Sequence, residues 1–330
     1  MVLNSLRLRV FAIAALSWLT AVSPAMAQEW PDKPIRLIVP APPGGISDSV
    51  ARLLGEQLRA NLGQPVLVDN KPGGSAVIAE RALMSAPADG YTLMVAPSSL
   101  LSDFPLTVKT PYDPVKTFTY VAGVASMIHV LVANTNFPPN SVKEALDYAK
   151  RNPRSVSVAN LSVGTRSDLL GEMLREKSGD NILTVPYKGS APAMVDLMGN
   201  QVQLTFEVVS NVAPLIKSGK LKGLAIVSST RSPHLPNVPS FGELGLPEFV
   251  MPDASIGVMI LSSMPKPLTD RIQSEVAKAV HSPKFREALA AQGFDLPKEA
   301  SMEEHRQRLA VTMEQNRKII GKLKLQISPN

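Results

Sequence analysis

The residues best suited to bind a small anion stand where a short apolar run meets a glycine-rich turn and a helix. Residues 35–39 are mostly apolar and lie between two prolines, which is typical of a buried strand. The sequence PPGG at residues 42–45 then predicts a tight turn. Apolar residues recur at helical spacing over residues 46–58, and Ser47 or Asp48 can cap that helix. Since the start of a helix presents unpaired N–H groups, this turn indicates half of a small-molecule site.

The same pattern of strand, glycine-rich turn and capped helix is common in α/β proteins that bind nothing at the turn. The glycines lack the G-x-G-x-x-G spacing of dinucleotide-binding proteins, and the chain contains no G-x-x-x-x-G-K-[ST] sequence. No motif therefore supports a nucleotide ligand. A purely structural turn remains the alternative to a binding site.

Residues that could support catalysis or hold a metal ion are few. The chain has no cysteine, no G-x-S-x-G and no H-E-x-x-H sequence, and its four histidines are expected outside the binding loops or in helices. Aspartate, glutamate and histidine do not cluster at metal-ligand spacing. We therefore expect a binding protein without catalytic residues or a metal site, and an enzyme is the less favoured alternative.

The first residues have the pattern of a secretory signal peptide. Two arginines precede an apolar run at residues 10–22, and Ala-Met-Ala at residues 25–27 suits signal cleavage. We predict a signal peptide at residues 1–27, with Gln28 as the first mature residue. An N-terminal membrane anchor is the alternative, but the run is shorter than the ~20 residues that span a bilayer.

The composition of the 330-residue chain excludes several classes of partner. Its net charge of +6 is modest, and only 5% of its residues are aromatic. A stacking surface for nucleic acid is therefore not expected. Apolar residues make up 45% of the chain, so its 29 prolines indicate fixed turns in a folded protein rather than disorder.

Alternation of strands and helices predicts a parallel β-sheet in the first part of the chain. Apolar runs at 35–39, 66–68 and 92–96 alternate with two predicted helices, which is typical of βαβ units. Residues 105–120 are predicted as a surface loop, and a strand is expected at about 128–133. The loops after the parallel strands gather at one edge of the sheet, where ligands bind in such folds.

The middle of the chain repeats this design. A predicted strand at 155–159 is followed by a loop of small residues and a helix. Arg166 in that loop either pairs with a carboxylate or is a surface charge. The apolar run 255–261 can return to the first sheet. We therefore predict two α/β lobes with a cleft between them, a favoured place for a small-molecule site.

At this level of detail the chain resembles the exported solute-binding proteins of tripartite tricarboxylate transporters, the TctC or Bug family. The resemblance covers nearly the whole chain after the signal peptide, and the motifs together are highly specific. The matching segments are WPDKPIRLIVPAPPGGISD (30–48), LGQPVLVDNKPGGSAVIA (62–79), PADGYTLM (87–94), PYDPVKTF (111–118), VPYKGSAPAMVDLMGNQV (185–202) and GKLKGLAIVSSTRSPHLPNVPSFGELG (219–245).

The resemblance implies an α/β, two-lobed type II periplasmic-binding-protein fold with a ligand cleft between the lobes. Lobe I is expected at residues 28–126 and 250–330, and lobe II at 127–249. The resemblance also implies a periplasmic monomer without a cofactor, which captures a small carboxylate and delivers it to membrane subunits similar to TctA and TctB. Docking on a sensor kinase is the alternative to delivery.

The family's binding loops also map onto this sequence. The first loop is expected to hold a ligand carboxylate through backbone groups and the Ser47 hydroxyl. The second lobe is expected to contribute a loop at 162–168 and the YKGSAP loop at 187–192. The residues expected at the ligand are Ala41, Gly44, Gly45, Ile46, Ser47, Asp48, Ser98, Ser162, Gly164, Thr165, Asp168, Lys188, Gly189, Ala191 and Glu207.

Three residues depart from the family pattern. Ala41 stands where an aromatic residue is usual, Ile46 where a small residue is usual, and Asp168 where histidine is frequent. Together with Asp48 and Glu207, Asp168 would make the cleft more acidic than an anion site requires. We therefore expect a ligand with a cationic or neutral polar end, such as an amino acid or an amide.

Overall fold

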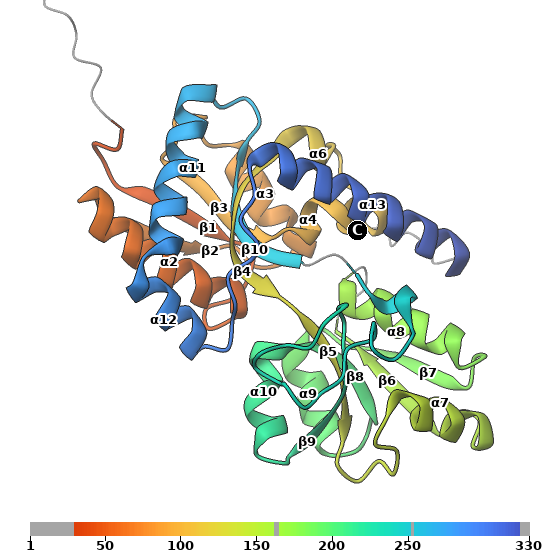
Figure 1. Cartoon of the computed structure of the whole chain (residues 1–330). Helices are drawn as coiled ribbons and strands as arrows, with labels where there is room; N and C mark the ends of the chain where they lie inside the picture. The colour runs from red at the N-terminus through yellow and green to blue at the C-terminus, as the bar shows by residue number, and fades with distance from the viewer. Residues whose placement is uncertain (1–29, 162–164, 252–253, 324–330) are drawn as a thin grey trace, which may run out of the picture.

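The computed structural model describes residues 30–161, 165–251 and 254–323, which form two lobes (Figure 1). Each lobe contains one five-stranded sheet, with apolar core residues packed on both faces of that sheet. The arrangement confirms the predicted two-lobed α/β fold.

The first sheet has the strand order β2-β1-β3-β10-β4. β1 runs parallel to β2 and to β3, as the alternation of strands and helices predicts. β10 runs antiparallel between β3 and β4, so the sheet is mixed rather than parallel throughout. The strands are β1 (Ile35–Val39), β2 (Val66–Asn70), β3 (Thr92–Pro97), β4 (Phe118–Met127) and β10 (Ala254–Leu261).

The second sheet has the strand order β7-β6-β8-β5-β9. β6 runs parallel to β7 and β8, whereas β5 runs antiparallel to both β8 and β9. The start of β5 therefore lies at the same sheet edge as the end of β8. The strands are β5 (His129–Asn134), β6 (Val156–Asn160), β7 (Ile182–Pro186), β8 (Leu204–Val208) and β9 (Leu221–Ile226).

Helices cover both faces of the first sheet because their apolar residues recur at helical spacing. In α2, Val50, Leu54 and Leu58 are at most 2% exposed and belong to one core with β1 and β3. The helices of this lobe are α2 (Ile46–Leu62), α3 (Val77–Met84), α4 (Ser99–Ser102), α5 (Phe104–Thr107), α6 (Pro114–Thr117), α11 (Lys266–His281), α12 (Pro283–Ala291) and α13 (Met302–Leu323), with a 3-10 helix at Gly74–Ala76.

Ser47 and Asp48 do not cap α2, contrary to the sequence prediction. The helix begins at Ile46 after Gly45, and no side chain accepts a hydrogen bond at this cap. Asp48 lies in the first turn, where its Oδ2 accepts a hydrogen bond from the Gly44 N–H at 2.9 Å. The carboxylate therefore holds the glycine turn from inside the helix, an arrangement that residue preferences alone do not reveal.

Residues 105–120 are not the surface loop expected from their prolines. They contain most of α5 and all of α6, and from Phe118 onward they form β4, where Phe118 and Tyr120 are buried. Asp113 caps α6 by accepting hydrogen bonds from two backbone N–H groups of the first turn. Pro105 and Pro114 stand at the starts of short helices, where a missing N–H is tolerated.

The capping motifs predicted further along the chain are present. Ser141 Oγ accepts a hydrogen bond from Glu144 N at 3.1 Å, and Ser301 Oγ accepts one from Glu304 N at 3.2 Å. These serines begin α7 and α13. The helices of the second lobe are α7 (Val142–Arg151), α8 (Arg166–Lys177), α9 (Ser190–Met198) and α10 (Val209–Lys217), with a 3-10 helix at Pro247–Phe249.

The two lobes are connected by helix α13, which packs against both, and by a buried ion pair. α13 packs against β4 and α4 of the first lobe and also against α8 of the second, where Ile319 contacts the core (Figure 1). Arg166, the first residue of α8, has its Nε 3.7 Å from Asp103 Oδ2, and the two side chains are 7% and 4% exposed. Asp103 Oδ1 also accepts a hydrogen bond from Asn316 of α13 at 2.9 Å.

The lobe boundaries assigned from the sequence stay predictions. Phe249 and Met251 are buried in the core of the second lobe, although residue 250 was the expected start of the return to lobe I. The strand β10, four residues beyond that position, belongs to the first sheet.

We expect Arg166 and Asp103 to be energetically coupled. Replacing one partner leaves the other buried group without its opposite charge, whereas replacing both does not. A double-mutant cycle of Asp103→Asn and Arg166→Gln, followed by urea unfolding, should give a coupling free energy of about 1–3 kcal/mol. The exposed pair Lys143–Asp147 is the matched control and should give a smaller coupling. Equal couplings in the two cycles would contradict a stabilising role for the buried pair.

Candidate ligand-binding cleft

A cavity of about 440 Å³ is lined by both lobes. Its volume lies within the range of natural small-molecule sites. The first lobe contributes the ends of β1 and β3, the turn before α2 and the 3-10 helix at Gly74–Ala76. The second lobe contributes the start of β5, the end of β8 and the starts of α8 and α9. The cavity thus lies where the sequence predicts that strand ends and loops gather.

The N-terminal ends of three helices meet at this cavity. Ile46 and Ser47 open α2, Arg166 and Ser167 open α8, and Ser190 opens α9, and all five residues line the cavity. The first turn of a helix presents backbone N–H groups and the positive end of the helix dipole. Their convergence from both lobes makes the cavity suited to an anion.

Hydroxyl groups add further hydrogen-bond donors to the cavity. Ser47 and Ser167 are both buried, and among the described residues Ser167 Oγ has no hydrogen-bond partner. Thr165 also lines the cavity and caps α8, since its Oγ1 accepts a hydrogen bond from Asp168 N at 3.4 Å. A buried hydroxyl that lacks a protein partner is costly unless a ligand or water satisfies it.

Arg166 gives the cavity its positive charge. The side chain is buried, lines the cavity and forms the ion pair with Asp103. His129 lines the same cavity, where burial and the positive charge of Arg166 lower its pKa to about 3. His129 is therefore neutral at physiological pH, and Arg166 carries the charge.

Among the described residues that line the cavity, Glu207 is the acidic one. It is 1% exposed, and burial raises the pKa of its carboxyl despite hydrogen bonds that favour the charged form. Its oxygens accept hydrogen bonds from Ser190 Oγ, from Val208 N at 2.7 Å and from Asn211 Nδ2 at 3.2 Å. Groups of the protein therefore already satisfy this carboxylate.

The residues expected at the ligand divide into those that line the cavity and those that do not. Ala41, Ile46, Ser47, Thr165 and Glu207 line it. Ser162 and Gly164 lie outside the described residues. The remaining predicted residues, which do not line the cavity, are Gly44, Gly45, Asp48, Ser98, Asp168, Lys188, Gly189 and Ala191.

The expectation of an acidic cleft is wrong, because Asp48 and Asp168 do not line the cavity and other side chains of the protein bind their carboxylates. Asp48 accepts hydrogen bonds from Arg52 Nε and from Asn70 Nδ2, both at 2.9 Å. Burial alone would raise its pKa, but these bonds and the one from the Gly44 N–H hold it below its ordinary value. Asp168 Oδ1 accepts a hydrogen bond from Asn160 Nδ2 at 2.8 Å.

The other predicted residues also have different surroundings from those expected. Ser98 lines a second cavity, and its backbone N–H donates to the Ser255 carbonyl at 2.7 Å. Lys188 and Ala191 are exposed. The YKGSAP loop therefore reaches the cleft through Ser190 rather than through these two residues.

Sequence reasoning left the role of Arg166 undecided and did not place His129 at the cleft. Arg166 is paired and buried rather than a surface charge, which no local pattern decides. His129 was expected outside the binding region, and this is wrong. β5 runs antiparallel to β8, so His129 is paired with Val208, directly after Glu207. The pairing of distant strands, rather than a sequence motif, brings His129 to the cleft.

We expect the neutral state of His129 to make the fold sensitive to acid. The folded-state pKa of about 3 lies below the ordinary value of 6.5, so the unfolded chain binds a proton that the folded protein does not. Stability therefore falls as the pH drops from about 6.5 toward 3, by at most about 1.4 kcal/mol per pH unit. His129→Gln should reduce the loss of unfolding free energy between pH 6.5 and 5 by about 1–2 kcal/mol in urea titrations. Parallel losses in both proteins would refute this role for His129.

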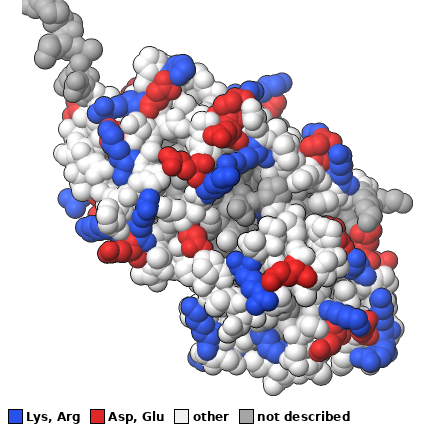
Figure 2. All heavy atoms as spheres, in the orientation of Figure 1, with Lys and Arg blue, Asp and Glu red and all other residues white. Residues whose placement is uncertain are grey.

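The described residues offer little sign of other binding chemistry. Within them, His, Asp and Glu do not gather in groups of three that could hold a metal ion. No helix of this part of the chain is long and apolar enough to span a bilayer. Basic and acidic side chains are intermixed on the face shown in Figure 2.

Comparison with known sequences assigns the chain to a family. The model of the tripartite tricarboxylate transporter family receptor, TctC, matches residues 50–325. Protein BugT of Bordetella pertussis is 37% identical over 289 residues, which cover 86% of this chain and 88% of BugT.

Solved structures similar to this chain have the same architecture. The periplasmic binding protein BugD has a TM-score of 0.79 and 34% identity, with 91% of this chain and 100% of BugD covered. R. palustris Rpa4515, solved with adipate, has a TM-score of 0.81 and 28% identity, with 92% of this chain and 100% of that chain covered. The matched family is one of substrate-binding receptors and not of enzymes. The chain therefore belongs to the tripartite tricarboxylate transporter receptor family, whose members are periplasmic solute-binding proteins.

Proposed function

We propose that this protein captures a small carboxylate in the cleft between its lobes and delivers it to a tripartite tricarboxylate-type membrane transporter. The convergence of the α2, α8 and α9 N-terminal ends with Arg166 on one cavity carries the proposal. Such a set of N–H groups and a guanidinium suits a carboxylate. The adipate bound to the related Rpa4515 supports the same ligand class.

The lining of the cleft favours an acid with an apolar body. Ile46, Leu100, Phe104 and Met127 line the cavity beside its polar groups. A cationic ligand end would have to bind near Glu207, whose oxygens already accept hydrogen bonds from the protein. The proposed ligand is therefore a mono- or dicarboxylate with an aliphatic or aromatic body, rather than the amino acid or amide expected from the sequence.

Calorimetry with a panel of ligands tests the carboxylate site. Adipate, shorter dicarboxylates, citrate, aromatic acids, amino acids and their amides are titrated into the protein. We expect binding of carboxylates, and Ser47→Ala and Ser167→Ala should each weaken it about tenfold by removing a hydroxyl donor to a charged group. Thr165→Ser should retain binding, because it keeps the hydroxyl group.

The control for this panel is Ser85→Ala, since Ser85 is exposed and lies outside the cleft. It should leave the dissociation constant unchanged. Binding of amino acids or amides alone would contradict the proposed ligand class. A carboxylate dissociation constant that changes in neither Ser47→Ala nor Ser167→Ala would contradict the proposed position of the site.

Delivery is tested with the exported protein and the membrane fraction of its host. We propose that residues 1–27 direct export to the periplasm, so the protein recovered there should begin at Gln28. Immobilised protein should retain transporter subunits from detergent-solubilised membranes, and more of them when its carboxylate ligand is present. Ligand-dependent retention of a sensor kinase without transporter subunits would show that the protein signals rather than delivers.

A further inference from the structure

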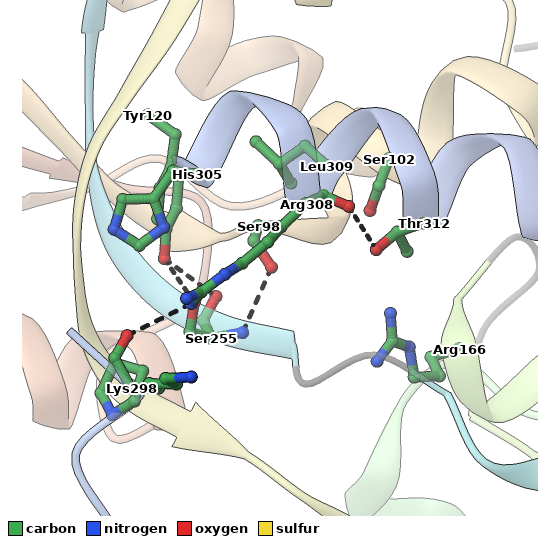
Figure 3. A pocket seen from close by; sticks show the side chains of 11 residues that line it. Ser98, Ser102, Tyr120, Arg166, Ser255, Lys298, His305, Arg308, Leu309 and Thr312 are labelled. Atoms are coloured by element: carbon green, nitrogen blue, oxygen red, sulfur yellow. Dashed lines mark hydrogen bonds between the residues drawn. The ribbon is translucent and has the colours of Figure 1, made fainter. Parts of the chain in front are cut away.

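A second cavity, of about 280 Å³, lies beside helix α13 and is separate from the ligand cleft (Figure 3). The segment just after β3 and the start of β10 lie between the two cavities. Ser98 and Ser255 line the second cavity, whereas their neighbours Ser99 and Ala254 line the cleft. Arg166 lines both cavities.

The charged side chains that line this second cavity are all basic. Arg166, Lys298 and Arg308 belong to its lining, and no aspartate or glutamate is among the described residues that line it. Arg308 Nη1 donates a hydrogen bond to the Lys298 carbonyl at 3.3 Å, which brings both side chains to the same edge (Figure 3). Within the described part of the chain, neither Lys298 nor Arg308 forms an ion pair with a carboxylate.

The nearest carboxylates already have other partners. Asp103 pairs with Arg166 and accepts the hydrogen bond from Asn316. Glu304 lies one helical turn before Arg308, but its Oε2 accepts hydrogen bonds from Ser301 N at 2.7 Å and from Ser301 Oγ at 2.8 Å. Glu304 therefore interacts with Arg308 at longer range but forms no direct ion pair with it.

The inner surface of the cavity is polar as well as basic. Tyr120 Oη and Ser255 Oγ lie 2.7 Å apart, and Ser98 Oγ accepts a hydrogen bond from Ser255 N at 3.2 Å (Figure 3). His305 stands over the Tyr120 ring, with the ring centroids 5.1 Å apart. Burial, and to a lesser extent the charge of Arg308, lower the pKa of His305 to about 4, so this imidazole is neutral at physiological pH.

We propose that this second cavity binds a small oxyanion of the phosphate type. Arg308 can donate two parallel hydrogen bonds to such an ion, and Lys298 supplies a compact positive charge. The hydroxyl groups of Ser98, Tyr120 and Ser255 line the same space and can exchange partners with the ion. The site lies outside the carboxylate cleft but shares Arg166 with it.

Titration with inorganic phosphate tests this site. Phosphate is added to the protein at constant ionic strength, because salt screens exposed charges, and binding is followed by calorimetry and by thermal unfolding. We expect saturable binding that Lys298→Gln combined with Arg308→Gln weakens about tenfold or more. Arg308→Lys should have a smaller effect, since it keeps the charge and loses the paired hydrogen bonds.

The matched control removes two positive charges elsewhere. Lys217 and Arg286 are exposed, belong to α10 and α12, and line neither cavity. Lys217→Gln combined with Arg286→Gln should change phosphate affinity less than twofold. An equal loss in this control, or the absence of saturable phosphate binding, would overturn the proposal.

Two further arms separate this site from the carboxylate cleft. Ser47→Ala and Ser167→Ala should leave phosphate affinity unchanged, because both serines line only the cleft. The Lys298→Gln, Arg308→Gln protein should still bind the cleft ligand. Loss of phosphate binding in the cleft variants would show that phosphate occupies the cleft, and would overturn the second site without deciding the ligand class of the first.

Discussion

The ion pair between Arg166 and Asp103 is the interaction on which the interior of this protein depends. It joins the first residue of α8 in one lobe to the segment between α4 and α5 in the other. Asn316 of α13 holds the same carboxylate, so the two lobes and the last helix meet at one group. A buried guanidinium needs such compensation, because losing its hydration costs several kcal/mol. Asp103 thus permits a positive charge to lie beside the cleft, and that charge adds to the effect of burial in lowering the pKa of His129.

The position of Arg166 between two cavities has a thermodynamic consequence. Just after β3 and at the start of β10, Ser98 and Ser255 line one cavity, whereas Ser99 and Ala254 line the other. Arg166 lines both cavities. Anions bound in the two cavities would both interact with Arg166, so each anion would change the affinity of the protein for the other by the same factor. The sign of this coupling depends on whether Arg166 moves with one ion or contacts both.

Local sequence patterns predict much of this fold, and the errors have a common cause. The segment from β1 to α2 is predictable because its apolar runs, turn residues and helical spacing can all be recognised within thirty consecutive residues. β4 is not, because the prolines before Phe118 indicate a loop while the burial of that strand comes from its partner β10. His129 reaches the cleft only through the pairing of β5 with β8. The position of Arg166 likewise depends on Asp103, more than sixty residues away in the chain.

The carboxylates of the cleft loops show why counting charges along a sequence misjudges a site. Asp48 and Asp168 stand in the first turns of α2 and α8, where an acidic side chain is favourable beside backbone N–H groups. Each accepts a hydrogen bond from an asparagine at the end of a neighbouring strand, Asn70 or Asn160, and neither lines the cavity. These hydrogen bonds tie the first turns of α2 and α8 to neighbouring strands. An aspartate in a loop sequence therefore does not by itself make a neighbouring cavity acidic, because side chains of the protein can bind its carboxylate.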